Sequence, residues 1–466
     1  MSDVWAAVIG VVVLAAAGFL PVLVLVGGRL VALPLFPLAG AAIGALAAAS
    51  CIATFGTLLM WFVVWSVIAA IVSLVILIGR PDRLRATGRH LRRELTPLPL
   101  AGFVLMVAAA AWALRTLRVH NIGFDTRAIW MLHASWLLGG HSLAYSDIRN
   151  HFFVVSHPTY PPLVSAAMAL SWIISGNSDQ RVAVVTIALL NGCALVVAGW
   201  GVVEAARRAL LRTQGDSVRR QRVLLGLGVL LGALAIMVAG GVLGTFATNG
   251  YADPIWSLAA VSVVVYGLML DSTPSDLGVV AVLIPVCAYA KVEGMAMAVI
   301  LLVMVALRRR YRSGHLPLTS FRRFVLRIGV GVVVLLGWEL LTLAIGVPND
   351  PSITGARDGS LEQRAARTWD AAVPHLHVVV LALVCALCGW VLLNALRRRM
   401  GIGNDLWAWG ALALSIGVLG GAYVFGSGNI ELWLATSVNR TTIFVALLAW
   451  WMVAVWALCG TAAALQ

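Results

Sequence analysis

The apolar residues of this chain fall into long runs that are separated by short polar connections. A helix needs about 20 apolar residues to cross the hydrocarbon core of a bilayer, and many of the runs come near that length. Strands of a transmembrane β-barrel would instead alternate apolar and polar residues, which these runs do not do. The pattern predicts an all-α polytopic membrane protein with about thirteen spans, at 4–26, 31–50, 55–78, 99–117, 181–203, 223–244, 254–271, 277–290, 294–307, 324–345, 376–396, 404–424 and 442–459.

The composition agrees with this class of protein. Hydrophobic residues make up 61% of the 466 positions, charged residues only 11%, and the mean hydropathy is +0.96. A water-soluble domain would need far more polar surface. The first apolar run, 4–26, has no basic residue before it and no small-residue cleavage site, so we expect a membrane helix there rather than a removable signal peptide.

The positions of the basic residues predict the topology. The formal net charge is +14, but 23 of the 33 basic residues are Arg29 and the arginines of 80–93, 207–222, 308–327 and 397–399. These connections alternate along the chain, and connections rich in arginine face the cytoplasm. The N-terminus is therefore predicted outside and the C-terminus inside, and the positive charge requires no nucleic-acid partner.

Two apolar segments in the first long outer loop, 118–180, are too short to cross a bilayer. A crossing by "PLVSAAMALSWIIS" at 162–175 would also move the arginines of 207–222 to the outside. We therefore predict that it lies in the outer interface as a juxtamembrane helix. "TRAIWMLHASWLL", directly after Asp125, is expected to do the same, because its tryptophans suit the headgroup layer.

Ionisable residues at the mouths of the outer helices suggest chemistry. Asp125 lies in the first outer loop, Asp253 precedes a helix that begins with proline, and Arg440 lies at the mouth of the last helix. Lys291, the only lysine, is two residues from Glu293, which is either only its ion-pair partner or part of the same site. Carboxylates can take a proton from a hydroxyl, and Arg and Lys can hold a phosphate leaving group. The set favours transfer from a phosphate-linked donor in the bilayer to a hydroxyl outside, and no GxxxxGK[ST] loop for a soluble nucleotide donor occurs.

Four short motifs carry a resemblance to a known family. "GFDTRAIWMLHA", "HPTYPPLVS", "GYADPIW" and "YAKVEG" follow one another in this order. They resemble the membrane-embedded GT-C glycosyltransferases that use polyprenyl-phosphate sugars, such as the aminoarabinose–lipid A transferases and the protein O-mannosyltransferases. The resemblance covers about residues 99–445 and implies a GT-C-like transmembrane catalytic domain at 96–466. An N-terminal extension of three helices and a basic cytoplasmic linker, 1–95, lies outside the shared pattern.

The resemblance implies a role for each matching residue. Asp125 has the place of the catalytic general base, and Asp253 that of a second acidic residue, which positions the acceptor or supports the first. The donor phosphate would be bound by His157, Lys291 and Arg440. The supporting residues are Arg127, Tyr160 and Glu293. The motif "GFDTR" has one aspartate where metal-binding members have an acidic pair, so no metal ligand or other cofactor is assigned, and dependence on a divalent metal stays open.

The function that the resemblance implies is that of a glycosyltransferase in a bacterial inner membrane. It would move a sugar from a polyprenyl-phosphate donor to a hydroxyl of a cell-envelope lipid, glycan or protein on the extracytoplasmic face. The alternative is a transporter or flippase of a lipid-linked or small anionic substrate. Transporters usually show two matching halves with broken helices at the bilayer midplane, and the sequence shows neither.

Each candidate residue also has a structural explanation. Asp125 could pair with Arg127 or Arg118 to brace the loop, and Asp253 could be a helix N-cap. The polar outer loop 346–375 is either an ordinary solvated loop or a cover that contacts the acceptor. The spacing of a zinc site is absent from the histidines of the first outer loop, which are His120, His133, His141, His151 and His157.

The topology can be tested with inserted tags. Because the arginine clusters alternate, a tag at the N-terminus or at position 355 should be accessible from outside the cell, and tags at 215 or 315 should be protected. Labelling of intact cells with a membrane-impermeant reagent measures this. An accessible tag at 215 would show that 162–175 crosses the membrane.

Overall fold

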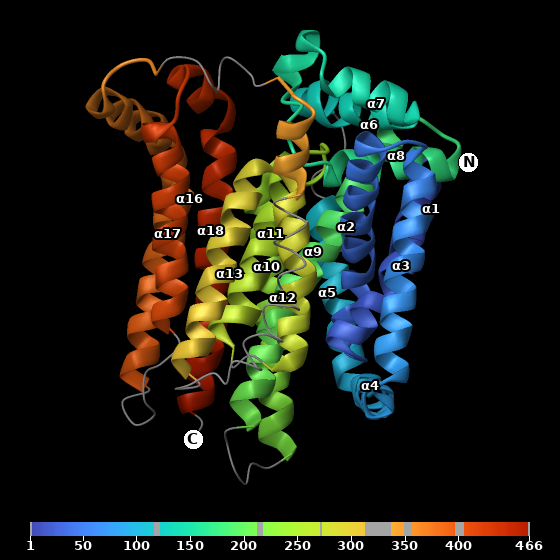
Figure 1. Cartoon of the computed structure of the whole chain (residues 1–466). Coiled ribbons are helices and arrows are strands. Elements are labelled where there is room, and N and C mark those ends of the chain that lie inside the picture. Colours follow the sequence, from blue (N-terminus) through green and yellow to red (C-terminus); the bar gives the residue numbers. More distant parts are fainter. Residues whose placement is uncertain are drawn as a thin grey trace.

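The structure of the chain is a computed structural model (Figure 1). It describes residues 2–115, 122–211, 218–270, 273–312, 337–348, 357–396 and 405–464. These residues form helices and no strand, which confirms the all-α class. The long helices are α1 (Asp3–Val26), α2 (Ala32–Ala53), α3 (Leu58–Ile78), α5 (Pro97–Arg115), α9 (Gln180–Leu211), α10 (Val218–Leu243), α12 (Pro274–Ala290), α13 (Val292–Arg312), α16 (Leu361–Leu396), α17 (Asp405–Phe425) and α18 (Ile430–Ala464). The shorter elements are α4 (Pro81–Glu94), η1 (Thr126–Met131), α6 (Leu132–Leu138), α7 (Gly140–Ile148), η2 (His151–Ser156), α8 (Leu163–Ser175), η3 (Gly244–Ala247), α11 (Asp253–Val264) and η4 (Val265–Met269).

The chain is a multi-pass membrane protein. Among the described residues, nine helices are long and apolar enough to cross a membrane, and each overlaps a span that the sequence predicts. The helices Leu361–Ala395 and Ile430–Ala462 begin well before the spans predicted there, 376–396 and 442–459. Further predicted spans fall on α11 with η4, on α12 and on α13. The predicted span 324–345 lies largely outside the described residues, so the total of thirteen stays a prediction.

The helices run side by side and form a bundle with two distinct ends (Figure 1). At one end lie α6, α7 and α8 together with the N-terminus, and we call it the outer end. At the opposite end lie α4 and the C-terminus, and we call it the inner end. The two termini therefore lie at opposite ends of the bundle, as the predicted topology requires. Which end faces the cytoplasm stays a prediction from the arginine distribution.

The segment 162–175 lies at the outer end, as predicted, but protein covers it, and it does not rest on the surface as an exposed helix would. It forms α8, which is too short to span a bilayer, as expected, but its residues from Leu163 to Trp172 are all buried. Helices α1, α2 and α9 surround it. At the contact with α1, a Cβ on Gly10 would lie 2.3 Å from the hydroxyl of Ser171, so only glycine allows this approach. Small residues on the neighbouring helices allow α8 to pack closely between them. Protein therefore covers the apolar side chains of α8.

The segment after Asp125 behaves in a similar way. It forms the π-helical turn η1 and then α6, and both pack on the body of the protein. Trp130 and Trp136 are buried, with 2% and 5% of their surface exposed. These tryptophans therefore pack inside the outer end and do not face a headgroup layer, contrary to the prediction.

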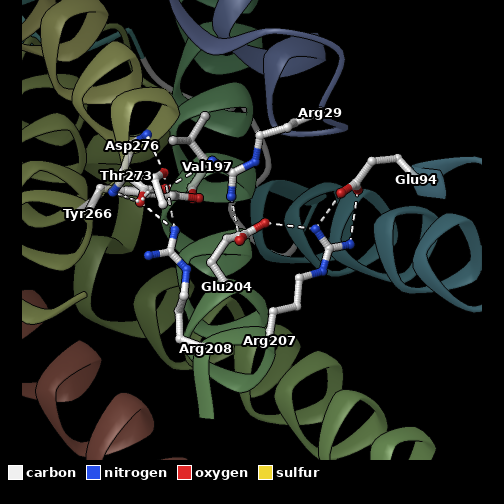
Figure 2. A network of polar contacts seen from close by, with 9 residues as sticks. All are labelled: Arg29, Glu94, Val197, Glu204, Arg207, Arg208, Tyr266, Thr273 and Asp276. Carbon is white, nitrogen blue, oxygen red and sulfur yellow. Dashed lines mark hydrogen bonds and ion pairs between the residues drawn. The ribbon is translucent and has the colours of Figure 1, made fainter. Parts of the chain in front are cut away.

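A network of ion pairs holds the inner end together (Figure 2). It joins three arginines to three carboxylates, namely Arg29, Arg207, Arg208, Glu94, Glu204 and Asp276. Arg29 lies between α1 and α2 and Glu94 ends α4, whereas the other members belong to α9 and α12. The network therefore ties the N-terminal extension to the rest of the bundle. The sequence analysis counted these arginines as a topology signal and missed the acidic residues that pair with them.

Asp276 is the best-connected carboxylate of this network. Its side chain is fully buried and accepts from Arg29 at 2.9 Å and from Arg208 at 2.5 Å. It also accepts at 2.7 Å from the backbone N–H of Thr273, whose hydroxyl caps α12 in return. Burial alone would lower the pKa of Arg29, but the charges of Glu204 and Asp276 outweigh burial and raise it. Arg29 therefore stays charged and depends on both carboxylates.

Loss of the Asp276 charge should destabilise the protein. Asp276→Asn leaves the buried guanidinium of Arg29 with one carboxylate fewer, and breaking a buried ion pair costs about 3–5 kcal/mol. We expect a lower temperature of thermal unfolding in detergent. The control is Arg89→Gln, an exposed arginine of α4, which should change stability by less than about 0.5 kcal/mol. Unfolding of Asp276→Asn at the wild-type temperature would contradict this role.

Candidate functional site

Four segments that are far apart in the sequence meet at the outer end. Asp125 lies directly before η1, and Asp253 is the first residue of α11, followed by Pro254 in a position that suits the first helical turn. Lys291 has an extended backbone between α12 and α13. Arg440 comes from α18. The structure thus brings together four ionisable residues that the sequence analysis singled out at the outer end of the helices.

The contacts among these residues form a chain of alternating charge. Arg440 donates to Asp125 at 2.5 Å and lies 3.6 Å from Asp253. Lys291 donates to the other oxygen of Asp253 at 2.9 Å and lies 3.1 Å from Glu293. We call these five residues the outer charge cluster. With three carboxylates and two cations, it carries a formal charge of −1 when all are ionised.

Burial divides the outer charge cluster into an inner pair and an open rim. The side chains of Lys291 and Asp253 are only 4% and 3% exposed, whereas those of Asp125 and Glu293 are 23% and 28% exposed. Burial alone would lower the pKa of Lys291, but the charges of Asp253 and Glu293 outweigh burial and raise it. Lys291 therefore stays charged beside Asp253. Asp125 is the carboxylate that an incoming molecule reaches most directly, because the Oε2 atom of Glu293 is buried.

Neighbouring residues that the sequence analysis missed orient Arg440 and Asp125. The guanidinium of Arg440 lies over the ring of Tyr251, 5.0 Å from its centroid, as in a cation–π contact. A Cβ on Gly123 would lie 2.1 Å from the same ring, which explains the glycine of "GFDTR". Thr126 donates to the carbonyl of Asn249 at 2.6 Å and so fixes the loop of Asp125. The sequence could have indicated the role of Tyr251, because this residue lies in the quoted motif "GYADPIW".

His157 and Tyr160 lie beside the outer charge cluster. His157 has a left-handed backbone with a φ of 53°, which is rare for a residue with a side chain. Its ring stacks on Tyr160 at 4.8 Å, and Tyr160 stacks on Trp130 at 5.7 Å. Burial raises the pKa of the Tyr160 phenol, and the nearby charge of Glu293 raises it further. Tyr160 therefore interacts electrostatically with the outer charge cluster, and His157 stacks on the ring of Tyr160.

The structure also tests the structural explanations that the sequence offered for Asp125, Asp253 and Lys291. Asp125 pairs with Arg440, whereas Arg127 is exposed; Arg118 lies outside the described residues. Asp253 is not an N-cap, because that position belongs to Ala252. Lys291 does pair with Glu293, as the simpler explanation held, but it pairs with Asp253 as well.

The histidines of the first outer loop, 118–180, and the outer segment 346–375 were also the subject of predictions. Of the histidines in the first loop, His133 is hydrogen-bonded to Ser156 and His141 to the carbonyl of Cys51, while His120 lies outside the described residues. Across the described part of the chain, no three His, Cys, Asp or Glu side chains are arranged to hold a metal ion. In the outer segment 346–375, the residues from Leu361 on belong to α16.

Comparison with known proteins adds no assignment, since no family model, no curated protein and no solved structure matches the chain. The fold and the site therefore define the class only as a multi-pass α-helical membrane protein with a buried charge cluster at one end. Such a cluster can bind an anion through its cations or exchange protons through its carboxylates.

The pairing of Lys291 with Asp253 predicts strong energetic coupling. Lys291→Met and Asp253→Asn each leave a buried partner charge behind and should each cost about 3–5 kcal/mol of stability. The double variant removes both charges, so its cost should fall short of the sum by about 0.5–3 kcal/mol. Unfolding of the four proteins by denaturant measures this coupling, with exposed Arg127→Gln as a near-neutral control. Strictly additive costs would show that the pair does not interact.

Proposed function

We propose that this protein is a membrane glycosyltransferase. It transfers a sugar from a polyprenyl-phosphate donor to a hydroxyl of a cell-envelope lipid, glycan or protein, on the extracytoplasmic face of a bacterial inner membrane. The observation that carries the proposal is the outer charge cluster, in which four distant segments combine carboxylates and cations at one end of the bundle. The resemblance of its motifs to the GT-C glycosyltransferases supports the same assignment.

The cations of the cluster serve the donor phosphate. Lys291 and Arg440 are held side by side through Asp253, so one phosphate can contact both. In the free protein their charges are matched by carboxylates, and the phosphate must compete for them. The exposed Arg127, two residues from Asp125, adds positive charge at the open rim. Binding of the phosphate draws Arg440 away from Asp125 and frees that carboxylate.

Asp125 acts as the general base. It is the more exposed of the two proposed catalytic aspartates, so an acceptor hydroxyl can reach it, whereas Asp253 is buried and holds both cations in place. Asp125 takes the proton as the acceptor oxygen bonds to the anomeric carbon of the sugar. The bond between that carbon and the phosphate oxygen breaks, and polyprenyl phosphate leaves with its charge balanced by Lys291 and Arg440.

The competing function is transport or flipping of a lipid-linked or small anionic substrate, for which the same cations would bind the anion without chemistry. The two functions differ in what happens to the donor. Purified protein is reconstituted in vesicles with labelled polyprenyl-phosphate mannose or polyprenyl-phosphate arabinose and a cell-envelope extract as acceptor source. A transferase moves label from the lipid to the extract. Movement of intact labelled lipid between leaflets, with no transfer, would instead support the flippase.

Asp125→Asn should abolish most of the transfer while the protein still folds and binds donor. The amide keeps the size of the carboxylate but not its basicity, and general-base catalysis is worth about 10²–10⁴-fold. Turnover should drop by that order in the vesicle assay, and EDTA should have little effect on the wild type. The control is Asp370→Asn, an exposed carboxylate of α16, which should transfer normally. Wild-type turnover by Asp125→Asn would make the residue a loop brace, with Asp253 as the next candidate base.

A further inference from the structure

The outer part of α18 packs on a small hydrophobic core of its own. Helices α16, α17 and α18 lie side by side at one edge of the bundle (Figure 1). In the part of the chain that the structure describes, the main core includes buried residues of α18 only from Ile443 on. Before that point α18 belongs to a separate cluster, which we call the small outer core. Its buried residues are Tyr423 of α17 and Ile430, Leu434 and Val438 of α18. Arg440 lies where α18 passes from one core to the other, so both cores bear on its position.

Tyr423 is the polar centre of the small outer core. Its phenol oxygen is hydrogen-bonded to the hydroxyls of Ser437 and Thr441, each at 2.8 Å. These two residues are about one helical turn apart in α18, and Arg440 lies between them. The charges of the outer charge cluster also act on the phenol, so Tyr423 lies close to that cluster. The two hydrogen bonds therefore fix the turn of α18 from which Arg440 reaches Asp125.

Tyr423 is itself anchored by Arg364 of α16, whose side chain is fully buried. The guanidinium donates to the carbonyl of Tyr423 at 2.9 Å and to that of Gly428 at 3.0 Å. It also pairs with Asp358, which accepts at 3.2 Å from the backbone N–H of Ile430, the first residue of α18. A buried guanidinium is costly to leave without acceptors. These contacts therefore hold the end of α17 and the start of α18 in one arrangement.

Arg440 is thereby supported from two directions. On one side its guanidinium contacts Asp125 and the ring of Tyr251. On the other side Tyr423 holds the backbone of α18 from which the arginine projects. This second support does not compete with a phosphate for the guanidinium, so it can persist when a phosphate replaces Asp125. A binding group that is already held in place binds more tightly, because less freedom is lost on binding.

We propose that Tyr423 is a positioning residue for the phosphate site: it fixes the turn of α18 that carries Arg440 and so determines how tightly the outer charge cluster binds a phosphate. The inference rests on the proposed function, because there Arg440 binds the donor phosphate. Tyr423 does not touch the substrate and acts through Ser437 and Thr441.

The test compares two probes that differ only in the phosphate. Farnesyl phosphate and farnesol are titrated into the full-length protein in detergent, and isothermal titration calorimetry measures their affinities. Tyr423→Phe keeps the ring in the small outer core but removes both hydrogen bonds. It should weaken binding of farnesyl phosphate about two- to tenfold. Binding of farnesol should not change, because no phosphate is involved, whereas general damage to the protein would weaken both probes.

A double-variant cycle shows whether Tyr423 acts through Arg440. Arg440→Lys keeps the positive charge but loses the planar guanidinium, and should weaken binding of farnesyl phosphate by itself. In that background Tyr423→Phe should have little further effect, because the group that it positions is already gone. Losses that multiply independently would show that Tyr423 does not act through Arg440, and would overturn the inference.

Variants of α18 provide a second approach and a matched control. Ser437→Ala combined with Thr441→Val removes the same two hydrogen bonds from the other side and should reproduce Tyr423→Phe. Thr442→Val is the control, since this hydroxyl bonds the carbonyl of Asn439 at 2.9 Å instead, and it should bind both probes as the wild type does. Thermal unfolding shows that each variant is folded.

The positioning role and the transferase can fail separately. The role of Tyr423 is overturned if Tyr423→Phe binds farnesyl phosphate as the wild type does, if farnesol binding weakens equally, or if the wild type binds both probes alike. Unchanged phosphate binding in Tyr423→Phe, together with loss of transfer in Asp125→Asn, would refute the positioning role and keep the transferase. Phosphate binding that depends on Tyr423 through Arg440, with no transfer in the vesicle assay, would keep the positioning role and refute the transferase.

Discussion

Each charge that the two ion-pair networks of this bundle remove from water meets an opposite charge, and the arrangement of the helices depends on these pairings. The cost of desolvating an ion is offset only when its partners lie within hydrogen-bonding distance. At the inner end, Asp276 and Glu204 balance Arg29 and its neighbours; at the outer end, Asp253 balances Lys291 and Arg440. Because the partners come from different helices, each network fixes how those helices pack.

The two ends differ in one respect that bears on function. The inner network has as many arginines as carboxylates, and its members satisfy one another. The outer charge cluster has one carboxylate in excess and includes two, Asp125 and Glu293, that reach its surface. A closed and balanced network suits a structural joint, whereas an open and unbalanced one can take up a proton or exchange partners with a ligand. This difference is why we place the chemistry at the outer end.

The N-terminal extension acquires a role at both ends. Arg29 and Glu94 bind it to α9 and α12 at the inner end. At the outer end, His141 of α7 donates its backbone N–H to the carbonyl of Gly56, which follows α2. A unit without a place in the resembled family pattern is thereby joined rigidly to the proposed catalytic part.

The sequence by itself showed that this chain belongs in a membrane and located most of its spans, because length and apolarity are properties of single segments. It also predicted the charged residues of the outer cluster, whose side of the membrane stays a prediction. Only the tertiary structure decided the partners: that Asp125 meets Arg440 rather than Arg127, and that Tyr251 orients this arginine. It also decided what covers α8. The sequence predicts this helix at the membrane surface, whereas the fold buries it among α1, α2 and α9. A short apolar helix looks the same whether lipid or protein covers it, and pairing between distant charges depends on packing that no local pattern encodes.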